Sequence, residues 1–179
     1  MIHTPPAIDL SIPAMRAWEK LPENIHAEVI NGKLYILPQP TLYHARIVTC
    51  ISIELANYVD NEMGEVFFSP IGVFLLEASN AVVPDIIFIS KDNPLLQLDR
   101  KGIFGPSDLH IEILSPGNRK HDLVTKKNLY EKAGVKEYWI VNPDTKDSWG
   151  YLLENNRFDE PLVMNSKIHI RILNKTINF

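Results

Sequence analysis

The sequence contains only one cysteine, Cys50, so no disulfide can form within the chain. Because disulfides are typical of secreted proteins, a single cysteine favours a reducing, cytoplasmic setting. No apolar run approaches the roughly 18 residues that a membrane span requires. The N-terminus also lacks a basic segment followed by an apolar one. We therefore expect no membrane association and no signal peptide.

Positive charge is scarce as well. Lysine and arginine together number 18 against 22 acidic residues, which gives a formal net charge of −4 and a pI of about 5.8. This balance excludes a protein that coats nucleic acid with a broad basic surface, but it leaves room for a small basic cleft. The sequence lacks a phosphate-cradling glycine loop, paired zinc-binding cysteines and a nucleophile elbow, which excludes P-loop NTPases, zinc ribbons and serine hydrolases.

What is present is the composition of an ordinary globular protein. Hydrophobic residues make up 45% of the 179 residues and charged residues 22%. The length is close to that of one domain, and no repeat, linker or low-complexity tract divides the chain. We therefore expect a single domain over residues 1–179 with one sizeable core.

Turn and periodicity signals predict the elements. Asn31-Gly32 between two extended runs predicts a β-hairpin over residues 26–37. Apolar residues at helical spacing predict a long helix over 43–61 with Thr41 as its N-cap. The remaining expected elements are helices at 14–21 and 119–133, strands at 65–76, 82–90, 109–115 and 135–141, a polar loop at 91–106, and short strands in the tail.

This element order predicts a mixed α/β (α+β) fold. A mixed sheet with a helix on each face, preceded by the N-terminal hairpin, is the natural packing of such elements. The strand–helix–strand unit over residues 109–141 should be a right-handed parallel crossover.

Two apolar strand segments each carry one unexpected carboxylate. Because side chains alternate along a strand, Glu112 shares a face with His110 and Leu114. A carboxylate there is costly unless it is paired or binds a metal. A half-exposed face or a salt bridge to a lysine explains Glu112 equally well, as a turn after Pro84 explains Asp85. Taken as a pair, Asp85 and Glu112 offer the oxygen ligands that Mg²⁺ or Mn²⁺ prefers.

The helix that follows supplies a lysine. Asp122, Lys126 and Tyr130 are spaced four residues apart and lie near one helix face, with Lys127 one position further round. Since this helix follows the Glu112 strand directly, it must pack near that strand. A lysine there could orient or deprotonate a metal-bound water, or stabilise negative charge. A solvated helix with an Asp122–Lys126 pair is the simpler interpretation of the segment taken alone.

The motifs together resemble one family, the Uma2 family of restriction-endonuclease-like proteins in the PD-(D/E)XK nuclease superfamily. The match extends over residues 28–143, so the core of the domain is expected at about 26–143. The residues that carry it are Glu28-Val29-Ile30-Asn31-Gly32, His44, Pro84-Asp85, Glu112, Leu114-Ser115-Pro116, Asp122, Lys126, Tyr130, Ala133-Gly134-Val135 and Glu137-Tyr138-Trp139-Ile140-Val141.

The resemblance implies a role for each central residue. The superfamily pattern is an Asp followed by Glu-x-Lys on the next strand, and here the second motif reads Glu112-Ile113-Leu114. Leucine stands where lysine is expected, so the resemblance implies that Lys126 supplies a relocated lysine, with Lys127 as the alternative. The implied catalytic residues are Asp85, Glu112 and Lys126, and the implied metal ligands are Asp85, Glu112 and the backbone carbonyl of Ile113.

Other residues are expected to support this site. Glu28 matches the family's N-terminal acid, although an exposed strand acid explains it equally well. His44 and Asp122 could face the site, and Tyr130 could orient the lysine, although capping and core roles are simpler for His44 and Tyr130. Arg119 and Lys120 begin a local basic cluster that also contains His121, Lys126, Lys127 and Lys132. Its residues either contact nucleic-acid phosphates or are simply solvated.

The function implied is that of a metal-dependent endonuclease. It would use Mg²⁺ or Mn²⁺ to hydrolyse phosphodiester bonds of nucleic acid, with DNA as the favoured substrate. Two alternatives stay open. The first is a catalytically inactive nuclease-fold protein that acts in binding or assembly, which the acidic pI and the missing Glu-x-Lys lysine favour. The second is a hydrolase of smaller phosphate esters. Because related nucleases often work as dimers, the resemblance also implies a homodimer.

Overall fold

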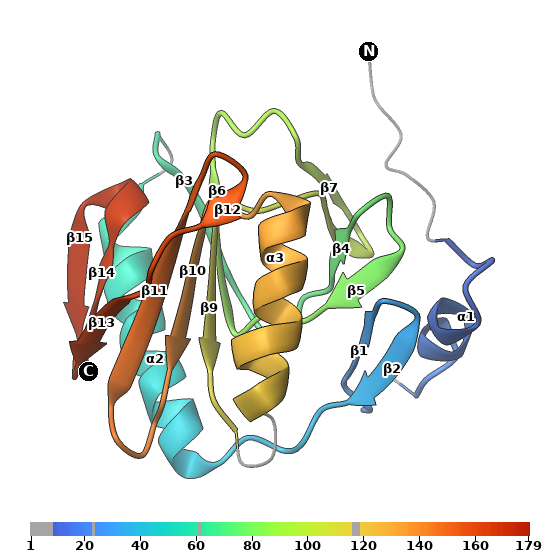
Figure 1. Ribbon diagram of the computed structural model, residues 1–179, viewed down its shortest axis with the longest axis horizontal. Coiled ribbons are helices and arrows are strands. Elements are labelled where there is room, and N and C mark those ends of the chain that lie inside the picture. The colour runs from blue at the N-terminus through green and yellow to red at the C-terminus, as the bar shows by residue number, and fades with distance from the viewer. Residues whose placement is uncertain (1–8, 23, 61, 116–118) are drawn as a thin grey trace.

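A seven-stranded sheet lies at the centre of the molecule (Figure 1). The computed structural model describes residues 9–22, 24–60, 62–115 and 119–179. The order of the sheet is β12-β11-β10-β9-β6-β3, with β13 paired to β11. Its strands are β3 (Gly64–Phe68), β6 (Ile86–Ser90), β9 (Leu109–Ile113), β10 (Glu137–Val141), β11 (Asp147–Glu154), β12 (Arg157–Phe158) and β13 (Leu162–Asn165). Strands β9 and β10 run parallel while the other pairs are antiparallel, which confirms the mixed sheet.

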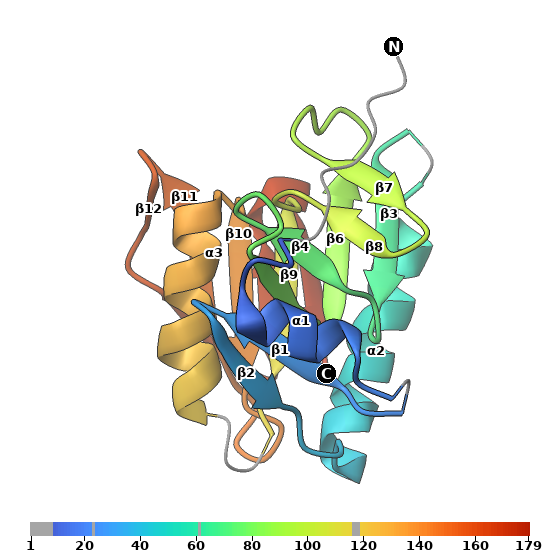
Figure 2. The same cartoon turned by 90° about the vertical axis from the view of Figure 1, so that its right-hand side faces the viewer.

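Two helices cover the two faces of this sheet, as predicted. Figure 2 shows the sheet between α2 (Leu42–Tyr58) and α3 (Lys127–Ala133). Helix α2 ends earlier than expected, at Tyr58. Its N-cap is confirmed, because the Thr41 hydroxyl oxygen accepts a hydrogen bond from the His44 N–H at 3.2 Å. A π-helical turn, His121–Lys126, leads directly into α3.

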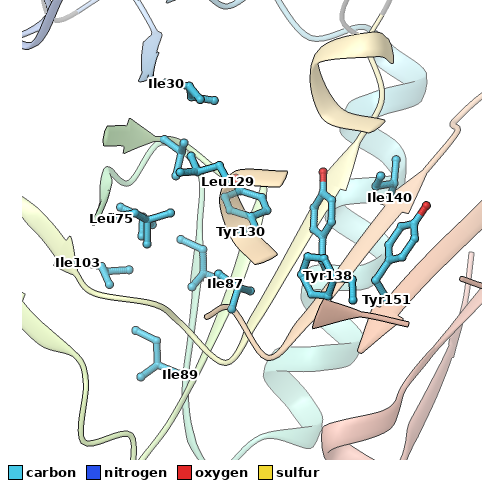
Figure 3. Packing of buried hydrophobic residues seen from close by; sticks show 14 of the residues in the cluster. Ile30, Leu75, Ile87, Ile89, Ile103, Leu129, Tyr130, Tyr138, Ile140 and Tyr151 are labelled. Atoms are coloured by element: carbon cyan, nitrogen blue, oxygen red, sulfur yellow. The ribbon is translucent and has the colours of Figure 1, made fainter. Parts of the chain in front are cut away.

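Strand alternation divides the core into two layers. Leu109, Ile111 and Ile113 of β9 pack against α2, together with the hairpin of β14 (Lys167–Ile170) and β15 (Lys175–Asn178). The opposite face carries Leu129 and Tyr130 of α3, which Figure 3 shows packed among side chains of the central strands. This second face is the one that Glu112 shares, so the alternation predicted for the strand is correct. Pro116, expected at the end of that strand, lies outside the described residues.

A second sheet, of six strands, lies beside the first in the order β2-β1-β5-β4-β8-β7. Its strands are β1 (Ala27–Ile30), β2 (Lys33–Ile36), β4 (Val73–Leu75), β5 (Asn80–Val82), β7 (Gln97–Asp99) and β8 (Gly102–Phe104). The predicted hairpin is confirmed, and Asn31 and Gly32 adopt the positive φ values, 50° and 72°, that its turn requires. Helix α1 (Pro13–Glu19) packs on this sheet through the buried Met15.

Two sequence-based expectations are wrong in this region. The predicted loop over 91–106 contains β7 and β8, because β8 pairs with β4, a partner far away in the sequence. The predicted strand over 82–90 is broken into β5 and β6. The Val83 N–H in the break donates to the carboxylate of Glu28 at 2.9 Å, and Pro84 has no N–H to donate. Within the described ranges, no helix is long and apolar enough to cross a membrane.

Candidate active site

A cavity of about 310 Å³ opens where the break between β5 and β6 meets the end of β9. Three separate segments of the chain contribute carboxylates and an amine to it. The predicted site residues that line it are His44, Asp85, Glu112, Ile113, Asp122 and Lys126. A central apolar strand, the bend before the next strand and the π-helical turn therefore bring their polar side chains to one place.

Lys126 lies at the centre of the charged groups. Its Nζ atom is 2.9 Å from Oε1 of Glu28, 2.9 Å from Oε1 of Glu112 and 3.5 Å from Oδ1 of Asp122. Burial lowers the pKa of the Lys126 ammonium, but the carboxylates of Glu112 and Glu28 outweigh that effect and raise the pKa well above its ordinary value. Lys126 is therefore protonated at neutral pH. As an ammonium group it can orient a water or offset negative charge.

Glu112 is 4% exposed, so the expectation of a solvent-facing strand acid is wrong and the expected lysine salt bridge is correct. Burial raises the pKa of Glu112, and Lys126 opposes this effect. The neighbouring carboxylates of Asp85 and Asp122 raise that pKa further. The Tyr130 hydroxyl, itself fully buried, donates a hydrogen bond of 2.8 Å to Oε1 of Glu112. Tyr130 thus both fills the core and orients the carboxylate.

Asp85 is held in the bend before β6. Its Oδ2 atom accepts a 2.7 Å hydrogen bond from the Ile113 N–H, and its Oδ1 atom is 3.2 Å from Nε2 of His44. The Nδ1 atom of His44 is in turn 3.3 Å from the hydroxyl of Ser115. Burial lowers the pKa of His44, but the hydrogen bond and the charge of Asp85 outweigh it and leave the pKa raised. His44 thus faces the site and orients Asp85.

Glu28 connects the N-terminal hairpin to the site. Its side chain is fully buried, so the interpretation as an exposed strand acid is wrong. Besides Val83 and Lys126, it contacts His121, whose Nε2 atom is 3.0 Å from Oε2 of Glu28. Burial raises the pKa of Glu28, yet Lys126 and the hydrogen bonds outweigh burial and lower it. Glu28 is therefore an ionised acceptor that fixes both the lysine and the segment leading to Asp85.

The predicted basic cluster separates into two parts. Lys126 and His121 turn inward to the carboxylates, whereas Arg119 and Lys120 are exposed. Lys127, the alternative catalytic lysine, lies instead with its Nζ atom 4.8 Å from the centre of the Tyr151 ring. Arg119 lines an adjoining hollow, which shares Ser115 with the cavity.

The donor set suits a divalent metal in its chemistry. In the described part of the chain, no three His, Cys, Asp or Glu side chains are already gathered around one point as metal ligands. Three carboxylates, those of Asp85, Glu112 and Asp122, nevertheless line the cavity beside one ammonium group. This excess of buried negative charge and these hard oxygen donors fit Mg²⁺ or Mn²⁺. Asp85 and Glu112, with the carbonyl of Ile113, are the residues that would hold it.

Two residues of this network were not expected in these roles, Ser115 and His121. His121 meets Glu28 across 93 positions of sequence, and Ser115 meets His44 across 71. No local pattern marks either contact. The π-helical turn that presents His121, Asp122 and Lys126 was not expected either, although such turns are rare and frequently lie at functional sites.

Comparisons with known proteins find a matching family and a similar solved structure. Residues 12–173 match the model of the Uma2 family, which is described as "Putative restriction endonuclease". The crystal structure of a "putative nuclease belonging to DUF820" from Anabaena variabilis is similar, with a TM-score of 0.71 and 20% identity. The similarity covers 88% of each chain. Among curated proteins, none matches this sequence. The family match spans most of the chain, and the structural neighbour shares its fold, so this protein belongs to the Uma2 family of restriction-endonuclease-like proteins.

Proposed function

We propose that this protein is a metal-dependent endonuclease that hydrolyses phosphodiester bonds of nucleic acid, with DNA as the favoured substrate. The observation that carries the proposal is the meeting of Asp85, Glu112 and Lys126 at one cavity, from the bend before β6, from β9 and from the π-helical turn. Burying charged groups such as Glu112 and Lys126 is costly unless they act together. Membership of the Uma2 family supports the same reaction class.

Each residue has a distinct task in the proposed reaction. Asp85 and Glu112, with the carbonyl of Ile113, bind Mg²⁺ or Mn²⁺. Such an ion, when bound, would supply Lewis-acid polarisation of the scissile phosphate and a water of lowered pKa. Lys126, held protonated by its carboxylates, orients the attacking water and offsets the charge that develops on the phosphate. Tyr130 holds Glu112 in place.

The remaining contacts position these groups. His44 contacts Oδ1 of Asp85, and the Ile113 N–H donates to Oδ2. Glu28 and Asp122 fix the ammonium of Lys126. Arg119 and Lys120, exposed at the start of the helix, contact phosphates of the bound strand. As the resemblance implies, the protein would act as a homodimer, and a monomeric mass by light scattering would count against that part. The single cysteine keeps the cytoplasm as the expected location.

The decisive experiment combines metal binding with cleavage. Mn²⁺ is titrated calorimetrically into the wild type and into Asp85→Asn and Glu112→Gln, with the exposed acids Asp92→Asn and Glu154→Gln as matched controls. We expect binding in the wild type and both controls, and a loss of affinity in both site variants. Unchanged affinity in the site variants would show that the carboxylates assigned here are the wrong ones.

Cleavage assays separate the nuclease from its two rivals. The same five proteins are incubated with plasmid DNA, RNA and a small phosphodiester at several salt concentrations. A nucleic-acid enzyme should lose affinity steeply as salt rises, whereas a hydrolase of small esters should hardly respond. Nucleic-acid binding without cleavage in any metal would instead identify the inactive nuclease-fold binding protein.

A further inference from the structure

A second hollow adjoins the candidate active site. It has a volume of about 420 Å³, and His26, Pro70 and Val83 border both hollows. We name it the α1 recess, because α1 forms part of its wall. It is lined by Trp18 and Glu19 of α1, by Leu21, Pro22, Ile25, His26 and Ala27, by Pro70, Gly72 and Phe74, and by Val83 and Lys101. In Figure 2, α1 lies across the front of the molecule beside β1 and β4.

The lining of the α1 recess is apolar and aromatic. Trp18 and Phe74 meet edge to face, with ring centroids 5.5 Å apart, and the Trp18 Nε1–H donates to the carbonyl of Ala27 at 2.9 Å. Leu21 and Ile25 add aliphatic surface. Because Phe74 is buried and the indole is tied to β1, this surface is preformed. Preformed, mostly apolar hollows of this volume are typical of small-ligand and cofactor sites.

The rim of the recess carries one acid and one base. The Nζ atom of Lys101 is 3.5 Å from Oε1 of Glu19, and their side chains are 62% and 39% exposed. An exposed ion pair of this kind contributes little to stability, so both groups are free to exchange partners. Glu19 can then accept from an exocyclic amine while Lys101 donates to a ring nitrogen or carbonyl oxygen.

We propose that the α1 recess binds a nucleobase of the substrate strand, from a nucleotide next to the scissile phosphate. This inference rests on the proposed nuclease function. A base combines a flat apolar face with a hydrogen-bonding edge, which matches an aromatic lining with a donor and an acceptor at its rim. The shared border at His26, Pro70 and Val83 lets a phosphate in the active-site cavity and its base in the recess be engaged together.

The proposal has a consequence for the substrate. A paired base cannot enter the recess without leaving its stack, and unstacking is least costly for single-stranded or mismatched nucleotides. The enzyme should therefore cleave single-stranded and mismatched DNA faster than a perfect duplex. The ion pair at the rim should in addition give preference for some bases over others at that position.

The first test removes the base. Oligonucleotides with a single abasic nucleotide at successive positions around the cut are cleaved in Mg²⁺ by the wild type. We expect one abasic position beside the cut to lower kcat/KM on the order of tenfold to hundredfold, the range measured for aromatic stacking of a base. No effect at any position would overturn the base-binding proposal while leaving the nuclease itself intact.

The second part of this test fills the recess. Ile25→Trp places an indole at a half-exposed position on its wall, and Ile53→Trp makes the same change on the outer surface of α2. In Ile25→Trp the intact substrate should be cleaved as slowly as the abasic one, whereas Ile53→Trp should behave as the wild type. If Ile25→Trp does not fold, Lys101→Ala on the exposed rim tests the same site by its altered base preference. Equal abasic effects in both tryptophan variants would contradict the assignment.

A binding measurement separates failure of the recess from failure of the nuclease. Free nucleosides, which carry no phosphate, are titrated into the wild type while the indole N–H resonance of Trp18 is followed by NMR, assigned with Trp18→Phe. Shifts at Trp18 that are lost in Ile25→Trp and kept in Ile53→Trp would support the base site even if no nucleic acid is cleaved. Absence of a response to every nucleoside, or a response to apolar peptides alone, would overturn the inference.

Discussion

Lys126 and Tyr130 share one acceptor, because both contact Oε1 of Glu112, at 2.9 Å and 2.8 Å. The two donors come from successive turns of one helix, and the acceptor comes from the middle of a buried strand. The carboxylate is therefore held from one side by a charge and a hydroxyl. No hydrogen bond to its other oxygen, Oε2, is formed within the described part of the chain, so Oε2 is the oxygen that would bind a metal in the proposed reaction.

Replacing Lys126 should lower both the free energy of unfolding and the rate of cleavage, and a second substitution should separate the two losses. In Lys126→Met, Glu28, Glu112 and Asp122 lose their shared cation, and breaking a buried ion pair from one side costs about 3–5 kcal/mol. Adding Glu112→Gln should recover part of that stability without recovering cleavage. Urea unfolding and a plasmid assay measure the two effects. The control Lys127→Met removes a contact with an aromatic ring, for which about 1 kcal/mol or less is expected. Equal losses for the two lysines would contradict the assigned network.

His110 should make stability depend on pH. Its ring is fully buried, and neither ring nitrogen has a hydrogen-bond partner among the residues described. Burial lowers its pKa from 6.5 to about 3. Between these values the unfolded chain binds a proton that the folded chain excludes, so stability is lost as the pH falls below 6.5. At pH 5 the loss from this residue is about 2 kcal/mol.

The variant His110→Phe keeps an aromatic ring beside Tyr130 but cannot bind a proton. We expect its free energy of unfolding to fall less than that of the wild type between pH 7.5 and pH 5, by about 2 kcal/mol. Urea unfolding at the two pH values gives the comparison. His169→Phe, on the C-terminal hairpin, serves as the control and should follow the wild type. A parallel pH response in His110→Phe would contradict the assignment to His110.

Gly150 should not tolerate alanine. It lies opposite Trp139 on the neighbouring strand, and a Cβ atom there would come within 2.3 Å of two indole carbons. Because Trp139 is fully buried, the ring cannot move without disturbing the core, and overpacking of this kind costs about 1–3 kcal/mol. Thermal and urea unfolding of Gly150→Ala measure the loss. Gly72→Ala is the matched control, since its nearest contact would be an ordinary 3.6 Å. Similar stabilities of the two variants would be inconsistent with this packing.

Glu137 should contribute to stability through its acceptor oxygens. One oxygen accepts from the indole N–H of Trp139 at 2.7 Å and from the Arg171 N–H at 2.9 Å, and the other accepts from the Ile172 N–H at 2.9 Å. In Glu137→Gln an NH₂ group must face at least one donor, and an unsatisfied buried group costs about 1–3 kcal/mol. Exposed Glu154→Gln should stay within about 0.5 kcal/mol of the wild type. Urea unfolding measures both variants. An unchanged midpoint for Glu137→Gln would argue against a stabilising role of these hydrogen bonds.

Local structure was predictable wherever a few neighbouring residues decide it. The turn at Asn31-Gly32 needs positive φ, which those two residue types tolerate, and the N-cap at Thr41 needs only a hydroxyl near the next N–H groups. Strands β7 and β8 were missed because β8 depends on pairing with β4, a distant partner. The prediction of a strand at Val83 was wrong, because the Val83 N–H donates to Glu28, 55 positions away, in place of a strand neighbour.

Some residues of the candidate site could likewise be predicted from the sequence, and others could not. Asp85, Glu112 and Lys126 could be selected from the sequence because a carboxylate in an apolar strand requires a partner, and because the motif string resembles one family. The supporting contacts of Ser115 and His121 could not be selected. They join residues that are 71 and 93 positions apart in the sequence, and no local pattern marks them. The catalytic roles of Asp85, Glu112 and Lys126 stay predictions, as does the single domain over residues 1–179.

By itself the sequence determined the alternation that turns Glu112 away from α2, the hairpin, the capped helix and the family. These features depend on backbone dihedral preferences and on periodicity, which are properties of neighbouring residues. Only the tertiary structure decided that Lys126, and not Lys127, meets the carboxylates, and that Glu28 is buried. Burial and ion pairing depend on which distant segments pack together. One position along the helix is enough to replace a buried ammonium among carboxylates by a half-buried one beside the Tyr151 ring.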